Sequence, residues 1–353
     1  MSETRARGPA TADGRVIARN MLVAAGMCLL PACGGDGGGD PVLSILARGV
    51  QFVPSTTLIS EQYRPSVRAS GSDVFFSDAT DAPLKWVSIQ GGAISSVGNG
   101  AIVQPLARFT LWGGMLLVAD GALIKAVPFS GGPVTTLLAA GTEAIDDIAT
   151  DGTSVLVGFL EPSGVRGVRR IPLDGGTPVD FVAPTYASHS SCLVRVAQDR
   201  SFVYWLSTPS MQDTWLDDCA IWRAPIQGGP ATLLREGPIL DFALSGEELF
   251  FLELSRSPTG SGQLKRISID GGSVTELSAG GLRVAVDAAA VFVGSGATLT
   301  IASRSGAPAT SLSASIIGAA VPSNAYSDLS VAPGAAYLAD PATGTVICVA
   351  PVP

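Results

Sequence analysis

A glycine-rich turn between two short apolar stretches recurs along this chain of 353 residues and constrains its fold more than any other feature. The clearest copy is IPLDGGTPVDFV at 171–182. Related copies lie at 88–97, 128–137, 225–234 and 268–277, and a degenerate copy, SRSGAPATSL, lies at 303–312. A tight turn between antiparallel strands needs residues at positive φ, which glycine adopts without steric cost. Each copy therefore predicts a β-hairpin.

A second pair of strands precedes every hairpin. Examples are VRASGSDVFFSD at 67–78 and FALSGEELFFL at 242–252, in which a short turn leads into a strand of bulky apolar residues. The repeating unit thus has four strands, and four-stranded units at this spacing are typical of a β-propeller blade. We expect an all-β fold, a β-propeller of seven four-stranded blades, with six blades as the alternative.

The last unit ends at GTVICVAPV, 344–352, without a fourth strand. The missing strand has a counterpart near the N-terminus, because GDPVLSILARG at 39–49 matches GGPATLLREG at 228–237. We therefore expect strand 41–47 to pair with strand 345–350 and to complete the last blade. Such closure removes the free sheet edges, where aggregation begins.

The composition of the chain is consistent with many short strands. It also argues against nucleic acid as a partner. Apolar residues make up 46% of the chain and charged residues 15%, with 42 glycines and 24 prolines. That is too apolar for disorder and too rich in glycine and proline for long helices. The net charge of −8 and the lack of a basic stripe argue against nucleic-acid binding.

The N-terminus predicts export. Four arginines within residues 1–20 precede the apolar run MLVAAGMCLLPAC at 21–33, a pattern typical of a secretory signal peptide. The ending LPAC resembles the bacterial lipobox, in which the cysteine is lipidated, although Pro31 departs from the usual residue. An ordinary cleaved signal with an incidental cysteine is the alternative.

This resemblance to lipoproteins divides the chain into a signal peptide at 1–32, a lipidated Cys33 with a glycine-rich tether at 33–40, and a propeller at 41–353. Gly34 stands where an aspartate would retain an enteric lipoprotein at the inner membrane. We expect anchoring to the outer membrane through the lipid (palmitate) alone, on the periplasmic or the outer surface of the cell.

The second strands carry a further resemblance. VFFSD, LLVAD, VYWLS and AYLAD, each followed by a third strand and a glycine hairpin, are similar to the YWTD, TolB-like and gluconolactonase-like bacterial propellers over about residues 41–353. In that group the aspartate of the motif mainly ties one blade to the next. By position it corresponds to Asp78, Asp120 and Asp340.

Carboxylates follow five of the second strands and should lie on one face: Asp78, Asp120, Glu161, Glu253 and Asp340. An acidic ring could hold Ca²⁺, since hard cations prefer several oxygen ligands. Gluconolactonase-like enzymes bind a divalent metal at the central opening through acids and asparagines, but Asn99 and Asn324 are the only asparagines after Asn20. Blade-to-blade hydrogen bonding is the favoured role, and we expect no cofactor.

His189 is the only histidine, which excludes a histidine-based metal site. Ser190 and Ser191 are its neighbours in sequence, but members of a catalytic triad must converge in space. A histidine on a surface loop is the simpler interpretation, so the chain is more readily understood as a binding protein than as an enzyme.

The longest insertion within a unit is STPSMQDTWLDDCAIW at 207–222. Trp215 and Met211 are large apolar residues in a polar loop, and Asp217 and Asp218 stand beside them. Exposed aromatic residues with a polar rim are typical of recognition surfaces. The alternative, in which Trp215 folds down to cover the blade, stays open.

Two cysteines belong to the same unit as this insertion: Cys192 opens its first strand and Cys219 opens its third. A close pair should oxidise beyond the inner membrane. The strand starts are about 10 Å apart, two strand spacings, so a Cys192–Cys219 disulfide requires the loop ends to converge.

The connections after second strands and before first strands should share one face, which collects the insertions at 159–166, 207–219 and 254–263 and also His189. We call this the loop-rich face, and the opposite one, with the short turns and glycine hairpins, the turn face. Long loops on a rigid ring are where recognition is built. We expect a monomeric, non-catalytic envelope lipoprotein that binds an envelope protein or a small ligand there, with Trp215 as anchor. A metal-dependent gluconolactonase-like hydrolase and a scaffold lipoprotein of envelope assembly are the alternatives.

Overall fold

The structure is a computed structural model. It describes residues 42–50, 66–80, 84–98, 100–102, 107–139, 144–160, 166–181, 195–207, 219–254, 262–295, 298–305, 310–313, 328–332, 335–340 and 344–350. Within these ranges the chain forms 28 strands and no helix. The described residues accordingly include no helix long and apolar enough to cross a membrane.

The strands form seven four-stranded antiparallel sheets, which are the blades. Blade 1 holds β2 (Val67–Ser70), β3 (Asp73–Ser77), β4 (Leu84–Ser88) and β5 (Ser95–Ser96); blade 2 holds β6 (Arg108–Trp112), β7 (Met115–Asp120), β8 (Leu123–Pro128) and β9 (Thr135–Ala139); blade 3 holds β10 (Ala144–Thr150), β11 (Ser154–Leu160), β12 (Arg166–Pro172) and β13 (Val179–Phe181).

Blade 4 holds β14 (Arg195–Gln198), β15 (Phe202–Ser207), β16 (Cys219–Pro225) and β17 (Thr232–Gly237); blade 5 holds β18 (Ile239–Ser245), β19 (Glu248–Leu254), β20 (Gly262–Ser268) and β21 (Thr275–Gly281). Blade 6 holds β22 (Arg283–Val286), β23 (Ala290–Ser295), β24 (Thr298–Ser303) and β25 (Thr310–Ser313); blade 7 holds β26 (Asp328–Ala332), β27 (Ala335–Asp340), β28 (Thr345–Ala350) and β1 (Val42–Arg48). The prediction of seven blades is confirmed, and the alternative of six is wrong.

Blade 7 is completed by the N-terminal strand, as predicted. β1 pairs antiparallel with β28, with Val42 opposite Ala350 and Arg48 opposite Thr345. Beyond the strands, the Val50 N–H donates to the carbonyl of Gly344 at 3.0 Å. A Cβ at position 344 would lie 2.6 Å from the Val50 carbonyl oxygen, and φ there is +62°, so this junction requires glycine.

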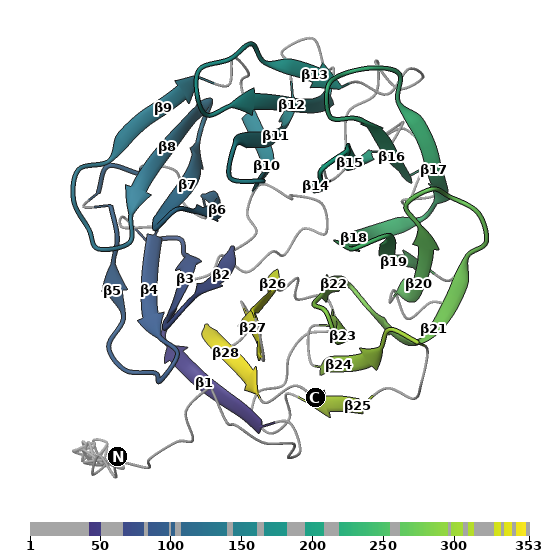
Figure 1. Cartoon of the computed structure of the whole chain (residues 1–353). Helices are drawn as coiled ribbons and strands as arrows, with labels where there is room; N and C mark the ends of the chain where they lie inside the picture. The colour runs from purple at the N-terminus through teal and green to yellow at the C-terminus, as the bar shows by residue number, and fades with distance from the viewer. Residues whose placement is uncertain are drawn as a thin grey trace, which may run out of the picture. The chain divides into compact units, whose positions relative to one another are not determined.

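The blades are arranged in a ring. Figure 1 shows the first strands β2, β6, β10, β14, β18, β22 and β26 around the centre, and β1 with the other fourth strands at the outside. Successive first strands contact one another all the way round, including β26 with β2. This is the geometry of a closed β-propeller.

The hydrophobic core is divided into seven clusters, one between each pair of neighbouring blades. In the cluster that joins blades 7 and 1, Leu46 and Tyr337 pack with Val67 and Phe76. The apolar residues of each second strand therefore serve the two neighbouring interfaces in alternation, as the pleat of a strand dictates. Each blade depends on both neighbours for its burial.

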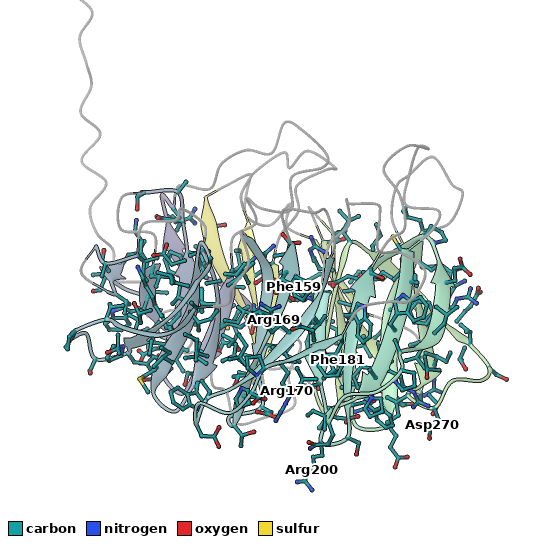
Figure 2. The ribbon with its side chains drawn as sticks, turned by 90° about the horizontal axis from the view of Figure 1, so that it is seen from above. Phe159, Arg169, Arg170, Phe181, Arg200 and Asp270 are labelled. Atoms are coloured by element: carbon teal, nitrogen blue, oxygen red, sulfur yellow. The ribbon has the colours of Figure 1, made fainter. Side chains whose placement is uncertain are left out.

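The two faces differ as the sequence predicted. First and second strands are joined by turns of two or three residues, such as 71–72 and 246–247. On the other face, residues 208–218 separate β15 from β16, and 182–194 separate β13 from β14. Figure 2 shows Arg200, from the turn between β14 and β15, and Asp270, from the hairpin between β20 and β21, on the same side of the ring, which is the turn face.

Candidate functional site

One position, at the loop-rich end of each first strand, forms a charged ring around the centre. It is the residue immediately before a buried apolar residue of the strand, and in every blade it lies opposite the equivalent residue of the second strand. From blade 1 to blade 7 these residues are Ser66, Arg108, Asp147, Arg195, Asp241, Arg283 and Asp328. Arginine and aspartate alternate in six of the seven blades. We call this set the charge ring.

Each aspartate of the charge ring ties its blade to the next. Asp147 accepts a hydrogen bond from the Val196 N–H at 3.1 Å, and Asp241 accepts one from the Val284 N–H at 3.0 Å. Asp328 accepts one from the Val67 N–H at 2.9 Å, so the same contact spans the junction at which the ring closes. These buried carboxylates satisfy backbone groups that would otherwise lack a partner at the start of a strand.

Arginines hold the same carboxylates from neighbouring blades. Arg195 Nε lies 3.1 Å from Asp241 Oδ1, and Arg283 Nη1 lies 4.0 Å from Asp241 Oδ2. Asp241 is only 1% exposed, and Arg283 is also buried. The ring is therefore a chain of desolvated charge pairs, in which removal of one member leaves its partner buried without compensation.

Burial and neighbouring charges shift the pKa values of two of these aspartates in opposite directions. Burial raises the pKa of Asp241 from 3.8 to about 6, although Arg195 acts against it. For Asp328, burial also acts upward, but Arg68, Arg195 and Arg108 outweigh it and hold the pKa below 3.8. Asp328 is thus the aspartate whose ionised form the folded ring stabilises.

Three of the acids predicted as metal ligands are held by the lysine of the neighbouring third strand. Asp78 Oδ2 lies 2.5 Å from Lys85 Nζ, Asp120 pairs with Lys125, and Glu253 lies 3.3 Å from Lys265. Glu253 also forms a bidentate contact with Arg235 at 2.8–3.2 Å. These are the only three lysines of the chain, and all three occupy the same position in their blades.

In blade 3 both members of this pair are replaced together. Phe159 stands where blades 1, 2 and 5 have the acid, and Arg169, which stands at the third-strand position of the lysines, has its guanidinium 5.0 Å from the centroid of the Phe159 ring (Figure 2). The pair is thus acid with lysine or aromatic ring with arginine. Asp78, Asp120 and Glu253 therefore act within their own blades. Among the described residues no group of three acids, histidines or cysteines could hold a metal ion.

The remaining predicted site residues lie outside the described residues. They are Cys33, Glu161, His189, Cys192, Met211, Trp215, Asp217 and Asp218. Asp340 ends β27, and its side chain is not described. Cys219 is buried at the start of β16. The Cys192–Cys219 disulfide therefore stays a prediction.

Several side chains on the turn face form contacts between neighbouring blades. Trp112 Nε1 donates to the Gly152 carbonyl at 2.9 Å and joins blades 2 and 3. Arg223 pairs with Asp270 at 2.9 Å across blades 4 and 5, and Arg304 pairs with Glu248 at 2.9 Å across blades 6 and 5. These side chains serve the assembly of the ring.

Known structures resemble this chain in fold. No protein-family model matches it, and no curated protein matches its sequence. The WD40 domain of Neurospora crassa Pan2 superposes with a TM-score of 0.57 at 9% identity, covering 88% of this chain and 96% of that one. A puromycin-hydrolysing peptidase of Mycobacterium tuberculosis gives 0.54 at 15% identity, covering 86% of this chain and 55% of that one.

A gluconolactonase of Xanthomonas campestris gives a TM-score of 0.45 at 16% identity, covering 67% of this chain and 82% of that one. The likeness is one of fold. At such identities a shared propeller carries no statement about activity, because propellers host binding, scaffolding and catalysis alike. The β-propeller part of the predicted resemblance is confirmed.

Proposed function

We propose that this protein is a non-catalytic, lipid-anchored β-propeller of the cell envelope, which binds a protein partner or a small ligand through its loop-rich face. The proposal rests on the unequal division of the two faces. Rigid blades with long connections on one side and minimal turns on the other are the usual arrangement of a recognition scaffold.

The uneven length of the connections points to blade 4. Second and third strands are separated by residues 121–122 in blade 2 and by 296–297 in blade 6, but by 208–218 in blade 4. β15 and β16 are paired up to Ser207 and Ala220, so the ladder beneath this connection is complete. A short turn would therefore be enough to join the two strands. The longer connection present here contains Trp215, Asp217 and Asp218.

The ion pairs formed by the acidic residues that follow the second strands favour a binding function over metal-dependent hydrolysis. Asp78, Asp120 and Glu253 are each compensated by a lysine in their own blade, which lowers their capacity to attract a divalent cation. A recognition surface built on the connections between strands does not require a group of acidic residues that converge on a metal ion.

Replacing Trp215 by alanine tests the binding site. We expect the variant to retain its melting temperature and to lose a partner that the wild-type chain captures from envelope extracts. Truncation of a central interface tryptophan typically costs at least about 2 kcal/mol, a loss of about thirtyfold in affinity. Leu123→Ala, a partly exposed residue of blade 2, is the matched control. Equal capture by the Trp215 variant, or its unfolding, would show that Trp215 only packs against the blade.

Replacing Cys33 by serine tests the anchor. The lipobox-like sequence supports lipidation at this residue, so the wild-type chain should incorporate a fatty-acid label and fractionate with membranes. The serine variant should lose both properties and be found uncleaved or released. Label that persists in the variant would overturn the assignment of Cys33.

A further inference from the structure

The closing strand β1 starts on the turn face. Third strands run from the loop-rich face to the turn face, because the glycine hairpins that follow them lie on the turn face, and β28 is the third strand of blade 7. β1 is antiparallel to β28, and Val42 lies opposite Ala350, the last residue of β28. The chain therefore enters β1 at the turn face and leaves it, at Arg48, on the loop-rich face.

The residue proposed to carry the lipid is close to the start of β1. Residues 34–41, GGDGGGDP, are all that separate Cys33 from Val42. A segment of this length spans at most about 30 Å when fully extended. As a glycine-rich coil it spans about 16 Å on average. By comparison β1, with seven residues, is about 20 Å long. The average reach of the tether is thus shorter than the strand to which it leads.

We propose, on the basis of the lipid anchor proposed above, that the turn face is directed toward the anchoring bilayer and the loop-rich face away from it. In the opposite orientation the tether would have to run back along all of β1 and also cross the headgroup layer, which is about 5 Å deep or more. Together these distances take up nearly the whole extended length of the tether and remove its conformational freedom. With the turn face toward the bilayer, the tether keeps that freedom.

The turn face has the properties of a surface that lies over headgroups without entering the bilayer. Its exposed charges have both signs, as Arg200 and Asp270 illustrate (Figure 2). Among the described residues the exposed large apolar side chains are Leu123 and Leu233, and neither lies in a turn or hairpin of this face. Surfaces that insert into a bilayer present an apolar face to it. The turn face therefore needs the lipid for its contact with the membrane.

This orientation restricts the kind of partner that the proposed recognition surface can bind. The connection 208–218 belongs to the face that points away from the bilayer. Blade 4 is also three blades away from blade 7, which is the greatest separation that a ring of seven blades allows. The partner therefore approaches from the aqueous side, as a soluble protein or ligand does. A protein embedded in the anchoring bilayer would meet the turn face instead.

Energy transfer measures the orientation. A fluorescent amino acid is placed at residue 200 or, separately, at residue 236 of the lipidated chain, in vesicles of phosphatidylethanolamine and phosphatidylglycerol with a headgroup-labelled acceptor. Arg200 and Glu236 are both exposed residues of blade 4, one in a turn of the turn face and one near the loop-rich end of β17. Residue 200 should lie nearer to the headgroups by about 20 Å, the length of a strand, and show the stronger transfer.

A longer tether is the matched control. Inserting about twenty glycine and serine residues between Gly39 and Asp40 raises the average span of the tether to about 30 Å, which exceeds the length of β1. Transfer from residue 200 and from residue 236 should then become more alike. The melting temperature of each labelled chain checks that the ring is intact. Should either label lower it, Asp270 and Arg48, which are exposed on the turn face and on the loop-rich face, provide a second pair.

The outcomes separate this inference from the anchor on which it rests. Transfer from residue 236 that equals or exceeds transfer from residue 200, in a chain that carries the fatty acid, would overturn the orientation and leave the anchor standing. A chain recovered without fatty acid would overturn the anchor and the orientation together. A difference that the longer tether leaves unchanged would overturn the role given to the tether.

Discussion

Removal of residues 41–48 should unfold the whole ring rather than one blade. β1 supplies the outer strand of blade 7, and Leu46 and Ala47 belong to the core between blades 7 and 1. Without them β28 has a free edge and that core a cavity. The lost side-chain burial and ladder hydrogen bonds amount to at least about 5 kcal/mol, which is comparable with the total stability of many domains.

Thermal unfolding followed by far-ultraviolet circular dichroism measures this effect. The truncated chain should show no cooperative transition, or a melting temperature lower by more than about 10 °C. Deleting residues 34–40 instead, which precede β1, is the matched control and should change nothing. A truncated chain that melts like the full one would show that closure by β1 does not hold the ring together.

Asp328→Asn should be the most damaging single substitution in the charge ring. Asp328 is buried at the closing junction and holds both the Val67 N–H and Arg68. Breaking a buried ion pair from one side costs about 3–5 kcal/mol. Asp270→Asn removes the partner of Arg223 on the turn face, where the carboxylate is 80% exposed, and should cost less than about 1 kcal/mol. Equal effects of the two substitutions would show that the ring contributes little.

The pH dependence separates Asp328 from Asp241. The pKa of Asp328 is lowered in the folded chain, so its contribution to stability is present above pH 3.8 and is lost as the pH falls through its folded pKa. The pKa of Asp241 is raised to about 6, so its contribution is greatest below pH 3.8 and is lost as the pH rises through 6.

Urea unfolding of wild type, Asp328→Asn and Asp241→Asn at several pH values measures both. The advantage of wild type over Asp328→Asn should shrink as the solution is acidified below pH 4. Its advantage over Asp241→Asn should instead shrink between pH 4 and 6, by on the order of 3 kcal/mol for a shift of about two pKa units. Differences that do not vary with pH would contradict these assignments.

The fold was predictable because its signals are local and repeated. Glycine hairpins, bulky second strands and the match of 39–49 to a fourth strand each concern residues close in sequence, and all are confirmed. The repeat also allowed the number of blades to be counted without knowledge of their packing.

The charge ring escaped prediction because its members meet only when the blades close. In the sequence, Arg195 or Asp241 alone suggests only a charged residue exposed to solvent near the end of a strand. The signal becomes visible when the first strands are aligned at the buried residue that follows, as in Arg108–Phe109 and Asp147–Ile148. The lysine partners of Asp78 and Asp120 could have been found in the same way, from the shared position of Lys85 and Lys125.

A photocrosslinking amino acid placed at residue 215 and, separately, at residue 270 tests most directly whether recognition resides on the loop-rich face. Both positions tolerate substitution if they serve no packing role, which the melting temperature of each variant checks. In intact cells, irradiation should join the chain labelled at 215 to a discrete partner, whereas the chain labelled at 270, on the turn face, should remain unlinked. A partner captured from 270 and not from 215 would contradict the assignment of the binding surface.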